Sequence, residues 1–134
     1  MLFENNTKKV LDRFFIRPTE EFHLRKLARE TKLSTTAVKN AIDSLKKERL
    51  VNVEKTKIKT TMIANRSDKF IRLKKLFNLK SIYLSEFYEK LIKDYKKPEC
   101  IILFGSYMRG EDIERSDIDI TVITEKEKKD YREY

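Results

Sequence analysis

Several residue types are scarce in this 134-residue chain. It has 2 glycines, 2 prolines and 1 cysteine. So little glycine and proline argues against collagen-like, linker-rich or many-turned all-β folds. The single cysteine, Cys100, cannot form an internal disulfide, which is typical of proteins from a reducing compartment. We therefore expect a cytoplasmic protein.

Long hydrophobic runs are also missing. No stretch approaches the roughly 20 consecutive apolar residues that a membrane span requires, and the first residues lack the pattern of a secretory signal. Apolar residues still make up 40% of the chain, with 8 Phe and 6 Tyr among them. That content is enough for a packed core, so we expect a folded α+β protein, rich in helix, with no membrane partner.

Positive charge dominates, but it is unevenly distributed. The net charge is +9. Residues 1–66 carry 16 basic and 8 acidic side chains, residues 67–97 carry 9 and 4, and residues 98–134 carry 6 and 10. A basic excess favours a polyanionic partner. The pattern predicts a basic unit over residues 1–66, a connector over 67–97 and an acidic unit over 98–134.

The first unit contains three helical periods followed by two alternating stretches. Helices are expected over about residues 6–16, 24–30 and 35–48. Ser34 or Thr35 can cap the third helix, because a hydroxyl accepts a hydrogen bond from a free N–H of the first turn. Strands are expected over residues 50–54 and 60–63, joined by a basic tip. His23 is interpreted as a structural or surface residue.

Three helices with a tight turn between the second and third, then a basic hairpin, resemble the winged helix-turn-helix family. The segment from Leu24 to Ser34 carries most of this resemblance. It implies that the third helix enters the major groove of double-stranded DNA while the hairpin, or wing, contacts phosphates. The DNA-binding residues would then be Thr35, Thr36, Lys39, Asn40, Lys55, Lys57 and Lys59. A solvated face or a protein-interaction module remains the alternative.

The connector has no glycine or proline between residues 68 and 95. Its large apolar residues nearly follow a heptad seam, interrupted by Lys80, through Phe70, Leu73, Phe77, Leu84, Phe87 and Leu91. One long helix is possible, as are two helices that meet near Phe77-Asn78. Further apolar residues widen the surface beyond one face. They indicate either packing against both neighbouring units or a homodimer interface, and we favour the homodimer.

The acidic unit contains the most specific motif. An apolar run typical of a buried strand, Cys100 to Phe104, precedes Gly105-Ser106, then Arg109-Gly110, then Ser116-Asp117-Ile118-Asp119. Carboxylates two residues apart project from one face of an extended segment. Such a pair is tolerated when a hard cation such as Mg²⁺ lies between them. A Gly-Ser step at a helix start provides backbone N–H groups and a hydroxyl that can donate to a phosphate, and the glycine leaves space for it.

This combination resembles the polymerase-β-like nucleotidyltransferase superfamily, particularly its minimal prokaryotic members. The resemblance implies that Gly105 and Ser106 hold the triphosphate of a nucleoside triphosphate. It makes Asp117 and Asp119 the catalytic ligands of Mg²⁺. Arg109 would support the phosphate loop or pair with an acidic neighbour. The implied reaction transfers a nucleoside monophosphate to a hydroxyl and releases pyrophosphate.

The family's third carboxylate, on a later strand, has no clear counterpart. The remaining acidic residues lie in a charged run without apolar neighbours and are Glu125, Glu127, Asp130 and Glu133. The resemblance covers about residues 98–124, the first third of the family's domain. We therefore expect a shortened chain, or a fold completed by another chain. Two strands alone are marginally stable, so they should pack on the connector or across a dimer.

The main hypothesis is a DNA-binding winged-helix protein, a transcriptional regulator, joined to two strands and a helix of an incomplete nucleotidyltransferase without turnover. One alternative is an active Mg²⁺-dependent nucleotidyltransferase in a longer native chain, with the winged helix as a targeting module. A further alternative is an adaptor whose winged helix binds protein and not DNA.

Overall fold

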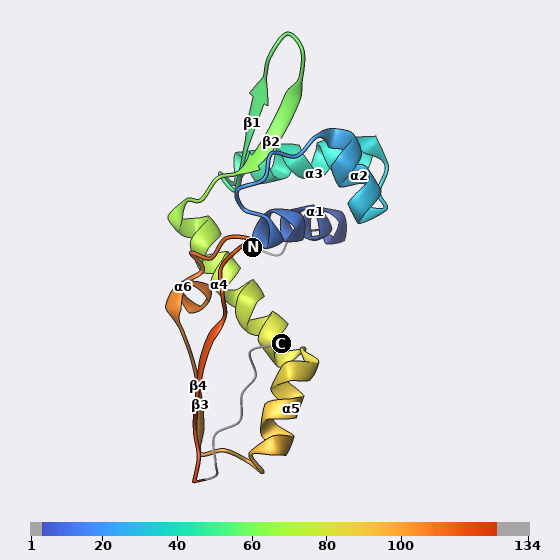
Figure 1. Cartoon of the computed structure of the whole chain (residues 1–134). Helices are drawn as coiled ribbons and strands as arrows, with labels where there is room; N and C mark the ends of the chain where they lie inside the picture. Colours follow the sequence, from blue (N-terminus) through green and yellow to red (C-terminus); the bar gives the residue numbers. More distant parts are fainter. Residues whose placement is uncertain (1–3, 126–134) are drawn as a thin grey trace.

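A three-helix unit with a protruding hairpin forms the first part of the chain (Figure 1). The computed structural model describes residues 4–125. The helices α1 (Asn5–Ile16), α2 (Leu24–Thr31) and α3 (Thr35–Lys47) precede the antiparallel strands β1 (Val51–Lys55) and β2 (Thr60–Ala64). The Ser34 hydroxyl accepts a hydrogen bond from the Ala37 N–H at 3.1 Å and caps α3. The predicted helices and strands of this unit are confirmed to within one or two residues.

The core of this unit is aromatic and aliphatic. Phe14 and Phe22 are fully buried and meet edge to face, with ring centroids 5.1 Å apart. Phe22 also exchanges two backbone hydrogen bonds with Met62, of 2.7 and 2.9 Å. The segment between α1 and α2 is thereby attached to the edge of β2. Phe70 of the connector belongs to the same core, so the connector begins inside the first unit.

The connector consists of two helices, α4 (Asp68–Tyr83) and α5 (Glu86–Asp94). They do not meet near Phe77-Asn78, as one of the two expectations had it, but at Leu84-Ser85. The physical reason is a cap, because the Ser85 hydroxyl accepts the N–H of Tyr88 at 3.2 Å and starts a new helix. Leu84 is 75% exposed. The break therefore divides the predicted heptad seam between two helices, and its role as a homodimer interface stays a prediction.

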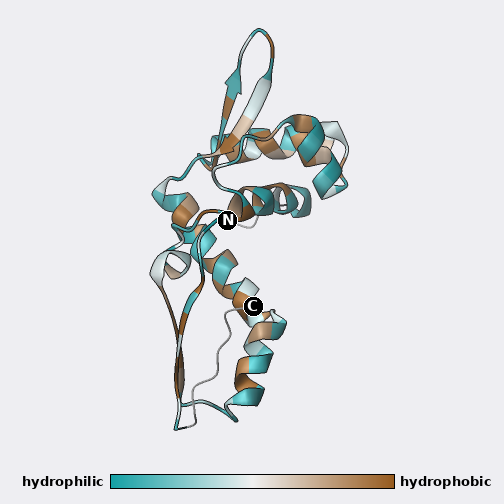
Figure 2. Ribbon diagram, in the orientation of Figure 1, coloured by the Kyte–Doolittle hydropathy of each residue, from teal (hydrophilic) through white to brown (hydrophobic). Residues whose placement is uncertain are grey.

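A second antiparallel pair lies beside the connector. Strand β3 (Cys100–Phe104) leads into the short helix α6 (Gly105–Arg109) and pairs with β4 (Asp119–Ile123). The inner face of the pair, with Leu103 and Ile120, borders a pocket of about 230 Å³ that residues of α4 and α5 also line. The outer face holds apolar residues such as Ile102 and is exposed. Much of this strand pair has the brown colour of hydrophobic residues in Figure 2. No residue of either strand is buried, and the connector contacts this part of the chain mainly through α6, so packing of the strands on the connector or across a dimer stays a prediction.

Helices are mixed with two small antiparallel sheets, which confirms the α+β class. Across residues 4–125, no helix has the length and apolar character needed to cross a membrane. His23 is exposed and directly precedes α2, in agreement with a surface role.

Candidate active site

Gly105 and Asp119 are in direct contact. Asp119 is the register partner of Phe104, so the start of β4 lies beside the end of β3, where α6 begins. Gly105 has a φ of +75°, and a Cβ added to it would lie 2.2 Å from Oδ2 of Asp119. Glycine is required at this position for two reasons. The backbone is left-handed, and the Asp119 carboxylate occupies the space that a Cβ would fill. The two ends of the predicted motif therefore meet.

The other predicted site residues lie within α6 or just before β4. Ser106 is half-buried, and its backbone carbonyl accepts the N–H of Glu111 at 3.0 Å. Asp117 is exposed and precedes β4 by two residues. The Arg109 Nε donates to the Glu111 carboxylate at 2.9 Å. Of the two roles that were open for Arg109, the structure supports the acidic neighbour.

The described residues contain no group of three or more His, Cys, Asp or Glu side chains that could hold a metal ion. Asp117 and Asp119 bring two carboxylates to the start of β4. Carboxylate oxygens suit Mg²⁺, so the two residues fit part of such a site. Three of the four other candidate acids, Glu127, Asp130 and Glu133, lie outside the described residues. Glu125 is exposed beyond the end of β4.

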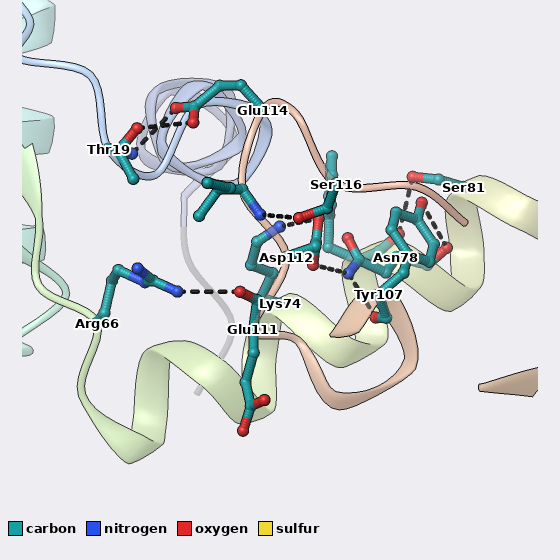
Figure 3. Close-up of polar contacts among 12 residues, drawn as sticks. Thr19, Arg66, Lys74, Asn78, Ser81, Tyr107, Glu111, Asp112, Glu114 and Ser116 are labelled. Atoms are coloured by element: carbon teal, nitrogen blue, oxygen red, sulfur yellow. Dashed lines mark hydrogen bonds and ion pairs between the residues drawn. The ribbon is translucent and has the colours of Figure 1, made fainter. Parts of the chain in front are cut away.

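A buried polar cluster connects α4 to α6 and to the loop that follows α6 (Figure 3). It was not predicted from the sequence. We call Lys74, Asn78, Tyr107 and Asp112 the Asp112 cluster. The Lys74 ammonium donates to Asp112 Oδ2 at 2.7 Å, and the Asn78 Nδ2 donates to Asp112 Oδ1 at 2.7 Å. Lys74 and Asn78 are each only 2% exposed. A signal was present, because Phe70, Lys74, Asn78 and Ile82 recur every four residues on the buried side of α4.

Two titratable groups near the site have shifted pKa values. Burial raises the pKa of Tyr107, and the nearby Asp112 carboxylate raises it further. Burial opposes ionisation of Glu114, but hydrogen bonds from the Thr19 hydroxyl and from backbone N–H groups outweigh it, so the pKa of Glu114 is lowered. Glu114 is therefore an anion at neutral pH and stabilises its contact with Thr19.

That contact ties the loop between α6 and β4 to the first unit. The Thr19 N–H and hydroxyl donate to the two Glu114 carboxylate oxygens at 3.0 and 2.7 Å. The Arg66 guanidinium donates to the Glu111 carbonyl at 3.0 Å. Figure 3 shows both contacts on the same side of the loop that leads to Asp117. The candidate site is thus joined to the three-helix unit by side-chain contacts as well as by α4.

The residues predicted to bind DNA are all exposed. Four of them lie at the start of α3 and three on the hairpin, and they are Thr35, Thr36, Lys39, Asn40, Lys55, Lys57 and Lys59. Lys59 lies 3.8 Å from the Glu21 carboxylate, so part of its charge is neutralised within the chain. The structure groups these residues on α3 and on the hairpin but does not test what they bind.

Comparison with known proteins supports the motif in the second half of the chain. Residues 86–134 match the family described as Polymerase beta, Nucleotidyltransferase. This part is nucleotidyltransferase-like. The match begins at the first residue of α5, so it includes that helix together with β3, α6 and β4.

One curated relative was found among known proteins. It comes from Methanocaldococcus jannaschii, is provisionally named a protein adenylyltransferase, and is 57% identical over 35 residues. The aligned stretch is 26% of this chain, and the chain covers 35% of that protein's length. No solved structure is significantly similar to the chain.

Proposed function

We propose that the second half of the chain binds Mg²⁺ and a nucleoside triphosphate and serves nucleotidyl transfer. The contact between Gly105 and the Asp119 carboxylate carries this proposal, because it joins the predicted phosphate-binding step to a predicted metal ligand. Gly105 leaves its N–H open to close approach by a phosphate oxygen. The Ser106 hydroxyl donates to the same phosphate group. Asp117 and Asp119 hold Mg²⁺ through their carboxylate oxygens.

When bound, Mg²⁺ neutralises the phosphates and polarises the phosphorus that receives the attacking hydroxyl. This chain's own contribution is to bind the triphosphate and orient it against that ion. Two carboxylates among the described residues are enough to hold a metal–nucleotide complex. Turnover additionally requires a group that deprotonates the acceptor hydroxyl. The name of the archaeal relative favours ATP as the donor and a protein hydroxyl as the acceptor.

Binding of Mg²⁺–ATP tests this proposal directly. We expect the wild-type chain to bind in titration calorimetry, with affinity lost when Mg²⁺ is chelated. Changing Asp117→Asn together with Asp119→Asn should weaken binding at least ten-fold, about 1.4 kcal/mol. The control changes the exposed acids Asp43→Asn and Glu54→Gln, removes the same charge, and should leave affinity within two-fold. Labelled ATP with candidate acceptors then measures transfer. No binding by the wild type would contradict the proposal.

We further propose that the first unit is a winged helix that binds double-stranded DNA. The observation that favours it is the bridge between Phe22 and Met62. Through this bridge, the segment before α2 forms a short third strand at the edge of the hairpin, as in a winged helix. The exposed start of α3 and the basic hairpin then lie where a groove-binding helix and a wing are needed. In this arrangement the chain is a DNA-binding protein, such as a transcriptional regulator, that also carries a nucleotide site.

The salt dependence of DNA binding tests the second proposal. We expect a steep negative slope of log affinity against log salt concentration, because phosphate contacts release counterions. Replacing Lys55, Lys57 and Lys59 by glutamine should reduce the slope by about 2, since Lys59 is partly neutralised by Glu21. The matched control replaces Lys93, Lys96 and Lys97 at the end of α5 and should keep the slope. A flat response in the wild type would favour the adaptor.

A further inference from the structure

The helix that carries Gly105 and Ser106 has no apolar anchor of its own. Helix α6 is five residues long and contains no buried residue. Its Met108 is 48% exposed, and the strand before it has an exposed outer face. A helix this short is not stable without contacts from neighbouring elements. Its position must therefore be set from outside.

Helix α4 provides the external contacts. The Asn78 Nδ2 donates to the Tyr107 carbonyl at 2.8 Å, and the Tyr107 hydroxyl donates back to the Asn78 carbonyl at 3.3 Å. At the end of α6, Gly110 approaches so closely that a Cβ on it would lie 2.5 Å from the Ile71 carbonyl. Backbone and side chain of α4 together hold the C-terminal end of α6.

The Asp112 carboxylate attaches the segment before Asp117 to α4 as well. It is bonded by both Lys74 and Asn78, and Asp112 is 7% exposed. Directly after it, the Ile113 N–H donates to the Ser116 hydroxyl at 2.9 Å, and the Ser116 N–H donates to the Ile113 carbonyl at 3.0 Å. This tight turn ends at the residue before Asp117. The position of Asp112 therefore determines the position of the turn that leads to Asp117.

The chemistry of the cluster fits a positioning role better than a stabilising one. Withdrawing the Lys74 ammonium and the Asp112 carboxylate from water is costly, and an apolar pair of similar volume is usually as stable or more so. A buried ion pair with directional hydrogen bonds instead restricts two segments to a single arrangement. The segments here are the middle of α4 and the loop between α6 and β4, which are 38 residues apart in sequence.

We propose that Lys74 and Asn78 are positioning residues for the nucleotide site, acting through Asp112 and Tyr107 on Gly105, Ser106 and Asp117. This inference rests on the proposed nucleotide-binding function. Neither residue touches the nucleotide. Both belong to the connector, so the site is built by a helix that lies before the region matched by the nucleotidyltransferase family.

The test replaces the ion pair by an apolar pair, Lys74→Met with Asp112→Leu. We expect the denaturation midpoint to fall only modestly, because Asn78 loses its bond to Asp112 but keeps its bond to the Tyr107 carbonyl. Amide hydrogen exchange over residues 105–111 should become at least ten-fold faster, and Mg²⁺–ATP affinity should fall at least ten-fold. The matched control is Lys69→Met with Glu48→Leu, an ion pair between the same helix and the first unit. It should leave both exchange in α6 and affinity unchanged. If the Lys74–Asp112 pair served stability alone, exchange in α6 and Mg²⁺–ATP affinity would change no more in this variant than in the control.

A second variant covers the case in which the double change prevents folding. Asn78→Leu keeps the ion pair but removes the bonds to Asp112 and to the Tyr107 carbonyl, so exchange in α6 should accelerate and affinity should fall about three-fold. Unchanged exchange and affinity in either folded variant would overturn the inference. A wild-type chain that binds no Mg²⁺–ATP would overturn the proposed function instead, and exchange in α6 would still decide the positioning.

Discussion

Gly110→Ala is expected to destabilise the protein by about 3 kcal/mol. Gly110 has a φ of +71°, and its added Cβ would lie 2.5 Å from the Ile71 carbonyl and 3.0 Å from the Lys75 side chain. A left-handed backbone costs an alanine roughly 1–2 kcal/mol. The remainder arises because the blocking atom belongs to the backbone of α4, which cannot move aside cheaply. Chemical denaturation measures the loss.

Two controls separate the causes of this loss. Lys97 has a φ of +65° and is exposed, so Lys97→Gly removes the left-handed backbone cost at a position without a close contact. It should stabilise the protein by about 1 kcal/mol, which measures the backbone part of the Gly110 effect. Gly110→Asn eases the backbone cost but retains the Cβ. Asparagine should therefore remain strongly destabilising, and a stability equal to that of the wild type would show that the close approach to α4 is not required.

Gly105→Ala is expected to weaken nucleotide binding at least ten-fold, with a smaller loss of stability than Gly110→Ala. Here the added Cβ meets Oδ2 of Asp119 at 2.2 Å and its Cγ at 3.1 Å, and these are atoms of a side chain that can rotate. The cost in stability is then roughly the 1–2 kcal/mol of the left-handed backbone. The displaced carboxylate no longer faces the phosphate-binding step, so Mg²⁺–ATP affinity should fall at least ten-fold.

The comparison between the two glycines is the informative measurement. Calorimetric titration and denaturation of both variants should show Gly110→Ala as mainly a stability variant and Gly105→Ala as mainly a binding variant. A double-mutant cycle with Asp119→Gly adds a check, because alanine at position 105 should cost less once the carboxylate is absent. Wild-type affinity in folded Gly105→Ala would contradict the role assigned to this contact.

Local patterns in the sequence predicted the first unit well. The helical periods of α1, α2 and α3 come from apolar residues that pack together within one small core, so sequence spacing and tertiary packing agree. The break in the connector was misplaced for the opposite reason. One of the two alternatives placed a break near Phe77-Asn78, yet Asn78 lies within α4 and its amide donates to Asp112 and to the Tyr107 carbonyl.

The motif of the candidate site could be predicted from the sequence, but the contacts that hold it in position could not. Gly105, Ser106, Asp117 and Asp119 follow a spacing that reflects two strands and the turn between them. The partners Lys74 and Asp112 are 38 residues apart and belong to different elements, so no local period relates them. Their pairing depends on how α6 docks onto α4, which is a tertiary event. For the same reason, the contact of Thr19 with Glu114 could not be anticipated.

That last contact has a consequence for the order of folding. Thr19 and Glu114 are 95 residues apart, so their bonds close a long loop of chain. Closing a loop of this length carries an entropic cost that must be met before the bonds form. The core around Phe14 and Phe22 closes over much shorter separations and should assemble first. The contact between Thr19 and Glu114 should then form late in folding, on a first unit that is already complete.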